Sequence, residues 1–175
     1  NAILTSKNHK TGTDRINEAF SLLGRNDIDF VMNLQGDEPL MDIDDIKNLN
    51  NQMIKNKSSL GTLASIIPDK EFYGNKNVVK VSTEEILNKN NFPKAINFMR
   101  KANEQTKNIY HHLGIYCYQK DVLKAFVSYN QSNNEIKNNL EQLRALDNNI
   151  QINVALAKTS PIGVDTEEDL VAIKK

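Results

Sequence analysis

The chain has 175 residues, of which 39% are hydrophobic, and its 22 basic residues balance 22 acidic residues to a formal net charge of zero. This length suits a single domain over residues 1–175 with a sizeable core. A zero net charge supplies no global field that would attract nucleic acid or a membrane surface. No apolar run approaches the roughly 18 residues of a membrane-spanning helix, so neither kind of partner is expected.

Strand-like and helix-like patterns alternate along the chain. In chain order, the expected strands cover residues 1–4, 28–35, 60–68, 77–83, 95–100, 112–119 and 152–159. The expected helices cover residues 13–23, with Thr13 or Asp14 as the cap, and 42–56, 121–129, 132–149 and 164–175. This alternation predicts an α/β fold with a mostly parallel mixed sheet flanked by helices and an antiparallel excursion near its middle.

The single cysteine, Cys117, lies in one of these apolar strands. One cysteine cannot form a disulfide within the chain, and such a position is typical of a small buried side chain. The sequence therefore favours an inert thiol in a reducing cytosol over a reactive one.

The stretch QGDEP, residues 35–39, follows a buried strand. Open α/β sheets bind ligands beyond the carboxyl ends of their strands, and a carboxylate there is a hard oxygen ligand suited to Mg²⁺. Asp37 is therefore a candidate metal ligand. The alternative is that Asp37 or Glu38 caps the next helix.

A second acidic stretch, GVDTEEDL at residues 163–170, again places glycine and aspartate between a strand and a helix. Asp165 could lie at the same sheet edge as Asp37, and two such carboxylates could hold one cation. Mg²⁺ usually takes one or two carboxylates and completes its shell with water and phosphate, which points to nucleotide chemistry. Asp165 as a plain N-cap is the alternative.

The loop HKTGTDR combines a glycine, hydroxyl groups and a guanidinium. Arg15 could bind a carboxylate or phosphate through two parallel hydrogen bonds, or could instead pair with Asp14 or Glu18. We expect Gly12 and Thr13 to contact a nucleotide.

Strand alternation places His112 and Tyr116 on one face of the strand HHLGIYCYQ and His111 on the other. A lone strand histidine is usually structural, so His112 needs other support for a site role. Glu141 and Gln142, in NNLEQLRAL, point away from a leucine stripe, and a solvated face is the default for such residues.

Together, TSKNHKTGTDR, NLQGDEPL, HHLGIYCY, NNLEQLRAL and PIGVDTEEDL resemble, in this order, the 3-deoxy-manno-octulosonate (Kdo) cytidylyltransferases. The resemblance implies a nucleotide-diphospho-sugar transferase (glycosyltransferase-A-like) fold and transfer of CMP from CTP to Kdo, giving CMP-Kdo and pyrophosphate for lipopolysaccharide synthesis. It also implies Mg²⁺ as cofactor and a cytoplasmic homodimer.

The resemblance assigns roles to individual residues. Asp37 and Asp165 match the magnesium ligands and would act as the catalytic pair. The sugar acid would be surrounded by Arg15, Gln35, Arg100, His112, Tyr116, Glu141 and Gln142, with Arg15 on its carboxylate. One departure is His111, where the family usually has arginine.

Family members begin with a strand and a basic, glycine-containing loop that grips the CTP triphosphate, and no segment here matches it. The resemblance therefore predicts an N-terminally incomplete sheet with an unpaired edge, and little or no activity for this chain alone. The alternatives are a non-catalytic remnant or partner subunit, and a different sugar-acid cytidylyltransferase such as CMP-sialic acid synthetase.

Overall fold

The structure is a computed structural model that describes residues 2–103, 105–161, 163, 164, 167, 170, 171 and 174. Its helices are α1 (Gly12–Leu23), α2 (Ile43–Asn56), α3 (Glu71–Gly74), α4 (Lys120–Ser128), α5 (Asn133–Asn138) and α6 (Leu143–Asp147). Its strands are β1 (Phe30–Asn33), β2 (Leu60–Ser65), β3 (Lys80–Thr83), β4 (Ala95–Met99), β5 (Ile109–Gln119) and β6 (Ile152–Leu156). None of the helices among these residues is long and apolar enough to cross a membrane.

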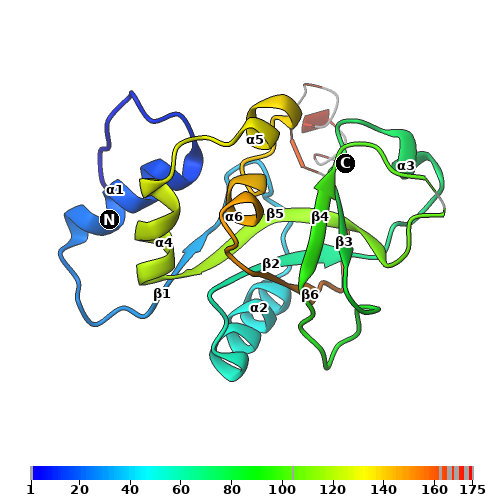
Figure 1. Cartoon of the computed structure of the whole chain (residues 1–175), viewed down its shortest axis with the longest axis horizontal. Coiled ribbons are helices and arrows are strands. Elements are labelled where there is room, and N and C mark those ends of the chain that lie inside the picture. Colours follow the sequence, from blue (N-terminus) through cyan, green and yellow to red (C-terminus); the bar gives the residue numbers. More distant parts are fainter. Residues whose placement is uncertain are drawn as a thin grey trace.

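The long strand β5 organises a mixed sheet flanked by helices, as expected (Figure 1). β2 pairs with it along one edge. The other edge is shared, because β3 pairs with its first residues and β1 with its last four. β4 and β6 continue the sheet outward from β3 and β2.

The expectation of mostly parallel pairing is wrong in detail. Within the described residues only β2 and β6 pair in parallel, while β1, β2 and β3 all pair antiparallel with β5 and β4 pairs antiparallel with β3. β1 and β2 do run in the same direction, as a strand–helix–strand unit requires, but β5 lies between them. The order of the strands in space is set by tertiary pairing, which chain order does not reveal.

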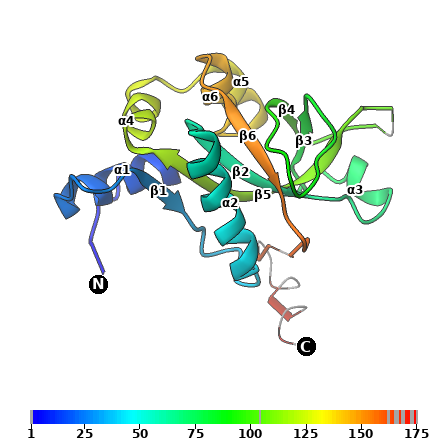
Figure 2. The same ribbon diagram turned by 90° about the horizontal axis from the view of Figure 1, so that it is seen from below.

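The two faces of β5 contribute to two separate cores. Leu113, Ile115 and Cys117 pack with α2. Tyr116 and Tyr118, which alternate with them, pack in a larger core with α1, α4 and α6. Figure 2 shows α2 and the α4–α6 segment on opposite sides of the sheet.

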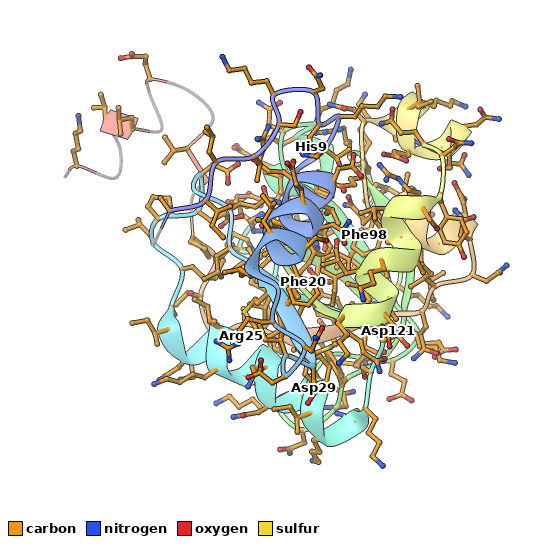
Figure 3. All side chains as sticks on the ribbon, turned by 90° about the vertical axis from the view of Figure 1, so that its left-hand side faces the viewer. His9, Phe20, Arg25, Asp29, Phe98 and Asp121 are labelled. Carbon is orange, nitrogen blue, oxygen red and sulfur yellow. The ribbon has the colours of Figure 1, made fainter. Side chains whose placement is uncertain are left out.

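The α1–α4 side shows how the helices separate apolar from charged residues. Phe20 of α1 and Phe98 of β4 are only 8% and 2% exposed and point into the protein, whereas Arg25, Asp29 and Asp121 lie at the surface (Figure 3). The predicted buried thiol is confirmed, because Cys117 has no exposed surface and burial raises its pKa to about 12.

Several predicted elements differ from the structure. Residues 2–4 form no strand, and Leu4 is 95% exposed, because no described strand pairs with them. α1 begins earlier than expected, because its N-cap is Thr11, whose hydroxyl accepts from the Asp14 N–H, and not Thr13 or Asp14. The helix expected over residues 164–175 falls largely outside the described residues.

The helix expected over residues 132–149 is broken into α5 and α6. Ser132 and Glu135 form a capping box at the start of α5. Asn139 then adopts a left-handed conformation with φ of 50°, which ends α5. The break matters for function, because residues 139–142 leave the helical path and turn toward the sheet.

Candidate active site

The loop after β1 carries the QGDEP motif, and Asp37 lies in it with an exposed side chain. The Asp37 carbonyl accepts a 2.8 Å hydrogen bond from the Val164 N–H. This bond joins QGDEP to GVDT, two motifs that are more than 120 residues apart in the sequence. Asp165 itself lies outside the described residues. The structure therefore shows that the two motifs are in contact, and the distance between the two carboxylates stays a prediction.

Asp37 and Glu38 do not cap the next helix. The N-cap of α2 is Asp42, whose carboxylate accepts from the Asp44 N–H at 2.7 Å. The structural alternative for Asp37 is thereby removed, and its carboxylate is available for another partner.

β5 supplies the floor of the site through His112 and Tyr116, which are 7% exposed each. Their rings lie 5.5 Å apart, and the His112 ring also meets the edge of Phe98 at 5.0 Å. The pairing of β5 with β2 shifts register between these two residues. Such a bulge leaves backbone groups outside the ladder, and here the Gly114 N–H donates to Oε1 of Glu38 at 3.3 Å.

One wall of the site is the turn at residues 139–142, and three cations hold it from behind. Arg100 donates to the carbonyls of Asn138 and Asn139, at 3.0 and 2.9 Å, and to that of Lys76 at 3.0 Å. The ammonium group of Lys80, whose side chain has no exposed surface, donates to the Arg100 carbonyl and to two carbonyls of the 75–78 loop, at 2.5–2.8 Å. The two side chains therefore tie the turn to the loop on the other side of the cavity.

Arg144 is the third cation behind this wall. Its side chain is 2% exposed and binds both carboxylate oxygens of Glu135, at 2.9 and 2.6 Å. A third nitrogen lies 3.5 Å from the Asp14 carboxylate, and the guanidinium sits 4.6 Å above the Phe126 ring. Arg144 thus fastens α6 to α5, α1 and α4. Glu141 and Gln142 directly precede α6, so their positions are fixed as well.

The opposite wall is the segment after β6, of which residues 158–161, 163 and 164 are described, and the buried carboxylate of Asp45 holds its start. Asp45 of α2 is 1% exposed and accepts from the N–H groups of Lys158 and Thr159 and from the Thr159 hydroxyl, at 3.0–3.4 Å. Ser160 follows directly and bonds to Nδ1 of His111 at 2.7 Å. Asp45 therefore fixes the position of Lys158 and Thr159, from which the chain continues to Val164.

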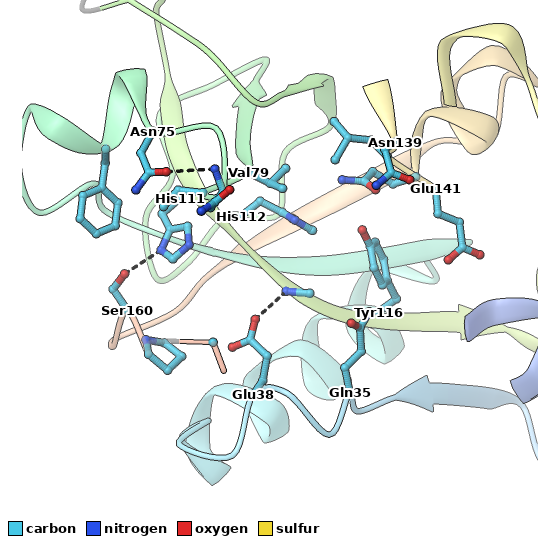
Figure 4. A pocket seen from close by; sticks show the side chains of 18 residues that line it. Gln35, Glu38, Asn75, Val79, His111, His112, Tyr116, Asn139, Glu141 and Ser160 are labelled. Carbon is cyan, nitrogen blue, oxygen red and sulfur yellow. Dashed lines mark hydrogen bonds between the residues drawn. The ribbon is translucent and has the colours of Figure 1, made fainter. Parts of the chain in front are cut away.

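These walls enclose a cavity of about 530 Å³ (Figure 4). Five of the sequence-predicted site residues line it: Gln35, His112, Tyr116, Glu141 and Gln142. A second hollow of about 520 Å³ adjoins it and is lined by Arg15, Gly12 and Asp37. The two hollows share Gln35 and Glu141, so a ligand could extend from one into the other.

No lysine or arginine is among the described residues that line the larger cavity, and burial makes its histidines neutral. Burial lowers the pKa of His112 to about 3 and that of His111 to about 4. Burial also raises the pKa of Glu141, an effect that the Thr13 and Thr11 side chains partly oppose. The cavity therefore suits an uncharged, hydroxyl-rich group, whereas the neighbouring hollow offers the charge of Arg15.

Three predicted site residues take other positions. Arg100 does not line the larger cavity, because its guanidinium is occupied by the three carbonyls. Thr13 is buried with its hydroxyl 3.1 Å from that of Tyr118. Arg15 lines the smaller hollow, and one of its nitrogens donates to the Thr5 hydroxyl and the Ser6 carbonyl, at 2.7 and 3.0 Å. Among the described residues, Arg15 forms no salt bridge with Asp14 or Glu18.

Other residues that line the cavity were not predicted from the sequence, among them Glu38, Asn75, His111 and Ser160. His111 points to the face opposite His112, as predicted, yet it still lines the cavity because Ser160, which bonds to it, and Pro161 lie at that edge. The only signal in the sequence was the unusual histidine beside His112.

The fold and the site define a nucleotidyltransferase with the nucleotide-diphospho-sugar transferase fold. A solved UDP-glucose pyrophosphorylase superposes on 95% of the chain with a TM-score of 0.66 at 15% identity, which supports the fold alone. A solved CMP:2-keto-3-deoxy-manno-octonic acid synthetase complexed with CTP covers 98% of this chain and 70% of its own, with a TM-score of 0.84 and 29% identity.

The sequence narrows the class further. The family model described as Cytidylyltransferase matches residues 1–152. The 3-deoxy-manno-octulosonate cytidylyltransferase of Thermodesulfovibrio yellowstonii is 40% identical over 99% of this chain and 72% of its own length. The 3-deoxy-manno-octulosonate cytidylyltransferase of Brucella canis is 37% identical over 97% of this chain and 68% of its own length. The chain belongs to the 3-deoxy-manno-octulosonate cytidylyltransferase family.

Proposed function

We propose that this protein transfers CMP from CTP to Kdo. In this reaction an oxygen of the sugar acid, its anomeric hydroxyl, forms a bond to the α-phosphorus of CTP. The bond from that phosphorus to the bridging oxygen of the β-phosphate breaks, pyrophosphate leaves, and the hydroxyl proton is released. The products are CMP-Kdo and pyrophosphate.

The observation that carries this proposal is the pair of adjoining hollows with different chemistry. The larger one presents amide, phenol, imidazole and carboxyl groups, which suit the hydroxyls of a sugar. The smaller one presents Arg15, whose Nε and second terminal nitrogen make no hydrogen bond within the described residues, and which can pair with the carboxylate of a sugar acid. Gln35 and Glu141 border both hollows and would hold the sugar between them.

We also propose that Asp37 and Asp165 hold Mg²⁺ here. The donor set fits, because the exposed Asp37 carboxylate is a hard oxygen ligand and lies beside the Val164 backbone. No group of three or more histidine, cysteine, aspartate or glutamate side chains converges among the described residues, so water and phosphate would complete the shell. When bound, Mg²⁺ would offset phosphate charge and lower the pKa of the attacking hydroxyl.

The remaining residues act by positioning the sugar and excluding water. Tyr116 and Gln142 are almost fully buried and would donate to or accept from sugar hydroxyls at fixed positions. Burial raises the pKa of Tyr116, so its phenol stays protonated and can donate. A reaction between two bound substrates gains most of its rate from such orientation.

Pyrophosphate release by the gene product that contains this chain tests the proposal, with CTP, Mg²⁺ and either Kdo or N-acetylneuraminate. Turnover with Kdo and none with N-acetylneuraminate is expected, while preference for N-acetylneuraminate would assign a CMP-sialic acid synthetase. Inactivity with both, although the protein is folded, would favour a non-catalytic protein.

Asp37→Asn should lower kcat at least about a hundredfold, in the range seen when a preorganised electrostatic group is lost. Asp29→Asn is the matched control, because Asp29 is an exposed aspartate just before β1, whereas Asp37 follows it. Equal activity of the two variants would contradict the metal site.

The resemblance further leads us to propose a cytoplasmic homodimer. Light scattering on the purified protein should give twice the mass of one chain, and a monomer at micromolar concentration would contradict this.

A further inference from the structure

Thr62, on β2, lies under the cavity floor and has no exposed surface. Its hydroxyl oxygen is 2.9 Å from Nε2 of His112 and 2.7 Å from the Ile115 carbonyl oxygen, with the Leu113 carbonyl more distant at 3.3 Å. The hydroxyl therefore has a short contact with an imidazole nitrogen and another with a carbonyl. Which of these two atoms receives the Thr62 proton follows from what each atom can donate or accept.

A hydroxyl has a single proton to donate, and a carbonyl can only accept. If the Thr62 proton pointed to His112, two acceptor oxygens would face each other at 2.7 Å without a proton between them. The proton is therefore donated to the Ile115 carbonyl, and the hydroxyl accepts from His112. That acceptance requires a proton on Nε2, and a neutral imidazole with a proton on Nε2 has a lone pair on Nδ1.

We propose that Thr62 is a positioning residue that holds His112 in the Nε2–H tautomer, so that Nδ1 serves as a hydrogen-bond acceptor for a hydroxyl of the ligand in the cavity. His112 lines the cavity between His111 and Tyr116 in the view of Figure 4. Its Nδ1 makes no hydrogen bond within the described part of the chain. The identity of the ligand rests on the proposed function, but the tautomer does not.

The surroundings of His112 keep the ring in this state. The ring is 7% exposed and lies between Phe98 and Tyr116. Burial, and to a smaller extent the neighbouring His111, lowers its pKa to about 3. The ring is therefore neutral at physiological pH and cannot pair with a carboxylate or phosphate as a cation.

This arrangement determines specificity at one position of the ligand. A neutral Nδ1 with a lone pair accepts from an O–H or N–H group and repels a carboxylate oxygen, a phosphate oxygen or a fluorine atom placed at the same point. The carboxylate of a sugar acid is thus directed away from His112 and toward the hollow that contains Arg15. The floor of the cavity selects a hydrogen-bond donor, such as a sugar hydroxyl.

Nitrogen-15 NMR of the imidazole side chains decides the tautomer without any substrate. The chain has three histidines, and the His112 signals are those that disappear in His112→Phe. At neutral pH we expect an unprotonated Nδ1 and a protonated Nε2, with no change down to about pH 4. A protonated Nδ1, or an imidazolium at neutral pH, would overturn the proposal whether or not the protein proves to be a Kdo cytidylyltransferase.

Thr62→Val removes the acceptor but keeps the shape of the side chain, and Thr62→Ser keeps the hydroxyl. We expect Thr62→Val to raise the KM for Kdo about tenfold, the size of effect that one lost neutral hydrogen bond produces, while the KM for CTP changes little. Thr62→Ser should restore the wild-type KM. An unchanged KM for Kdo in folded Thr62→Val, or an equal rise for both substrates, would contradict a positioning role.

Deoxyfluoro analogues of Kdo test the specificity directly, because fluorine replaces a hydroxyl but cannot donate. The analogue in which fluorine replaces the hydroxyl that contacts His112 should bind the wild-type protein about tenfold more weakly than Kdo does. This difference in affinity between the analogue and Kdo should be smaller in Thr62→Val. Equal deficits in the two proteins for every analogue would show that Thr62 does not act through His112.

Discussion

The two walls of the cavity are held in opposite ways. The turn at residues 139–142 is fastened by cations. Arg100 donates to the Asn138 and Asn139 carbonyls, Lys80 donates to the Arg100 carbonyl, and Arg144 donates to the buried Glu135 carboxylate. The segment after β6 is fastened by Asp45, which accepts from the N–H groups of Lys158 and Thr159.

The difference follows from the backbone groups that each wall presents. A chain that leaves a helix presents free carbonyls, and Arg100 satisfies two of them at the end of α5. The segment that leaves β6 presents N–H groups, and a carboxylate satisfies those. In both walls a buried charge organises a loop, so removing each charge should reveal how much of the site depends on it.

The largest effect is expected at Arg144. Arg144→Met leaves the Glu135 carboxylate buried without its partner and should lower the free energy of unfolding by about 3–5 kcal/mol, the cost of breaking a buried ion pair. Urea denaturation measures the change. Replacing both partners, in Glu135→Gln with Arg144→Met, should recover part of the loss, and a double variant no more stable than Arg144→Met would contradict this account.

Lys80→Met should come next, with a loss of about 3 kcal/mol, because three carbonyls lose a charged donor and only part of that loss is offset by burying a neutral side chain. Burial, together with the nearby Arg100, lowers the pKa of Lys80, so the charged form already bears a desolvation cost. Lys76→Met makes the same change four residues earlier at an exposed position, and its unfolding free energy should stay within about 0.5 kcal/mol of wild type.

Asp45→Asn tests the other wall. The amide keeps one acceptor oxygen but turns an NH₂ group toward backbone N–H groups, so we expect a loss of about 2 kcal/mol and a lower kcat, because the chain leading to Val164 and Asp165 loosens. Asp44→Asn is the adjacent control. Asp44 is exposed and pairs with Lys158 at the surface, so its replacement should cost well under 1 kcal/mol.

The smallest expected effect is a dependence of the free energy of unfolding on pH. His111 and His112 have pKa values of about 4 and about 3 in the folded protein, against an ordinary value near 6.5. Between these values the unfolded chain binds more protons than the folded one, so stability should fall as the pH drops below about 6.5, by at most about 1.4 kcal/mol per pH unit for each histidine.

Above pH 7 both histidines are neutral in both states and contribute no slope. Denaturation of wild type and His111→Gln between pH 7.5 and 5 measures the histidine contribution as a difference, and the variant should show the flatter dependence. Parallel curves would mean that His111 is not held neutral by the fold.

The sequence by itself determined where most strands and several helices lie along the chain, because apolar periodicity and turn residues act locally. It predicted α2 and the strands around Gly61, Val81 and Val154, and alternation along β5 correctly separated His112 and Tyr116 from Cys117. The motifs that resemble the family also led to five residues that line one cavity.

Tertiary structure decided the rest. Pairing places β5 between β1 and β2, which are neighbours in chain order, and this makes the sheet largely antiparallel. The left-handed Asn139 breaks a sequence that would otherwise continue as one helix, because Arg100 binds the carbonyls freed there. The protonation state of His112 likewise depends on Thr62, 50 residues away, since a hydrogen bond of this kind exists only when the chain has folded.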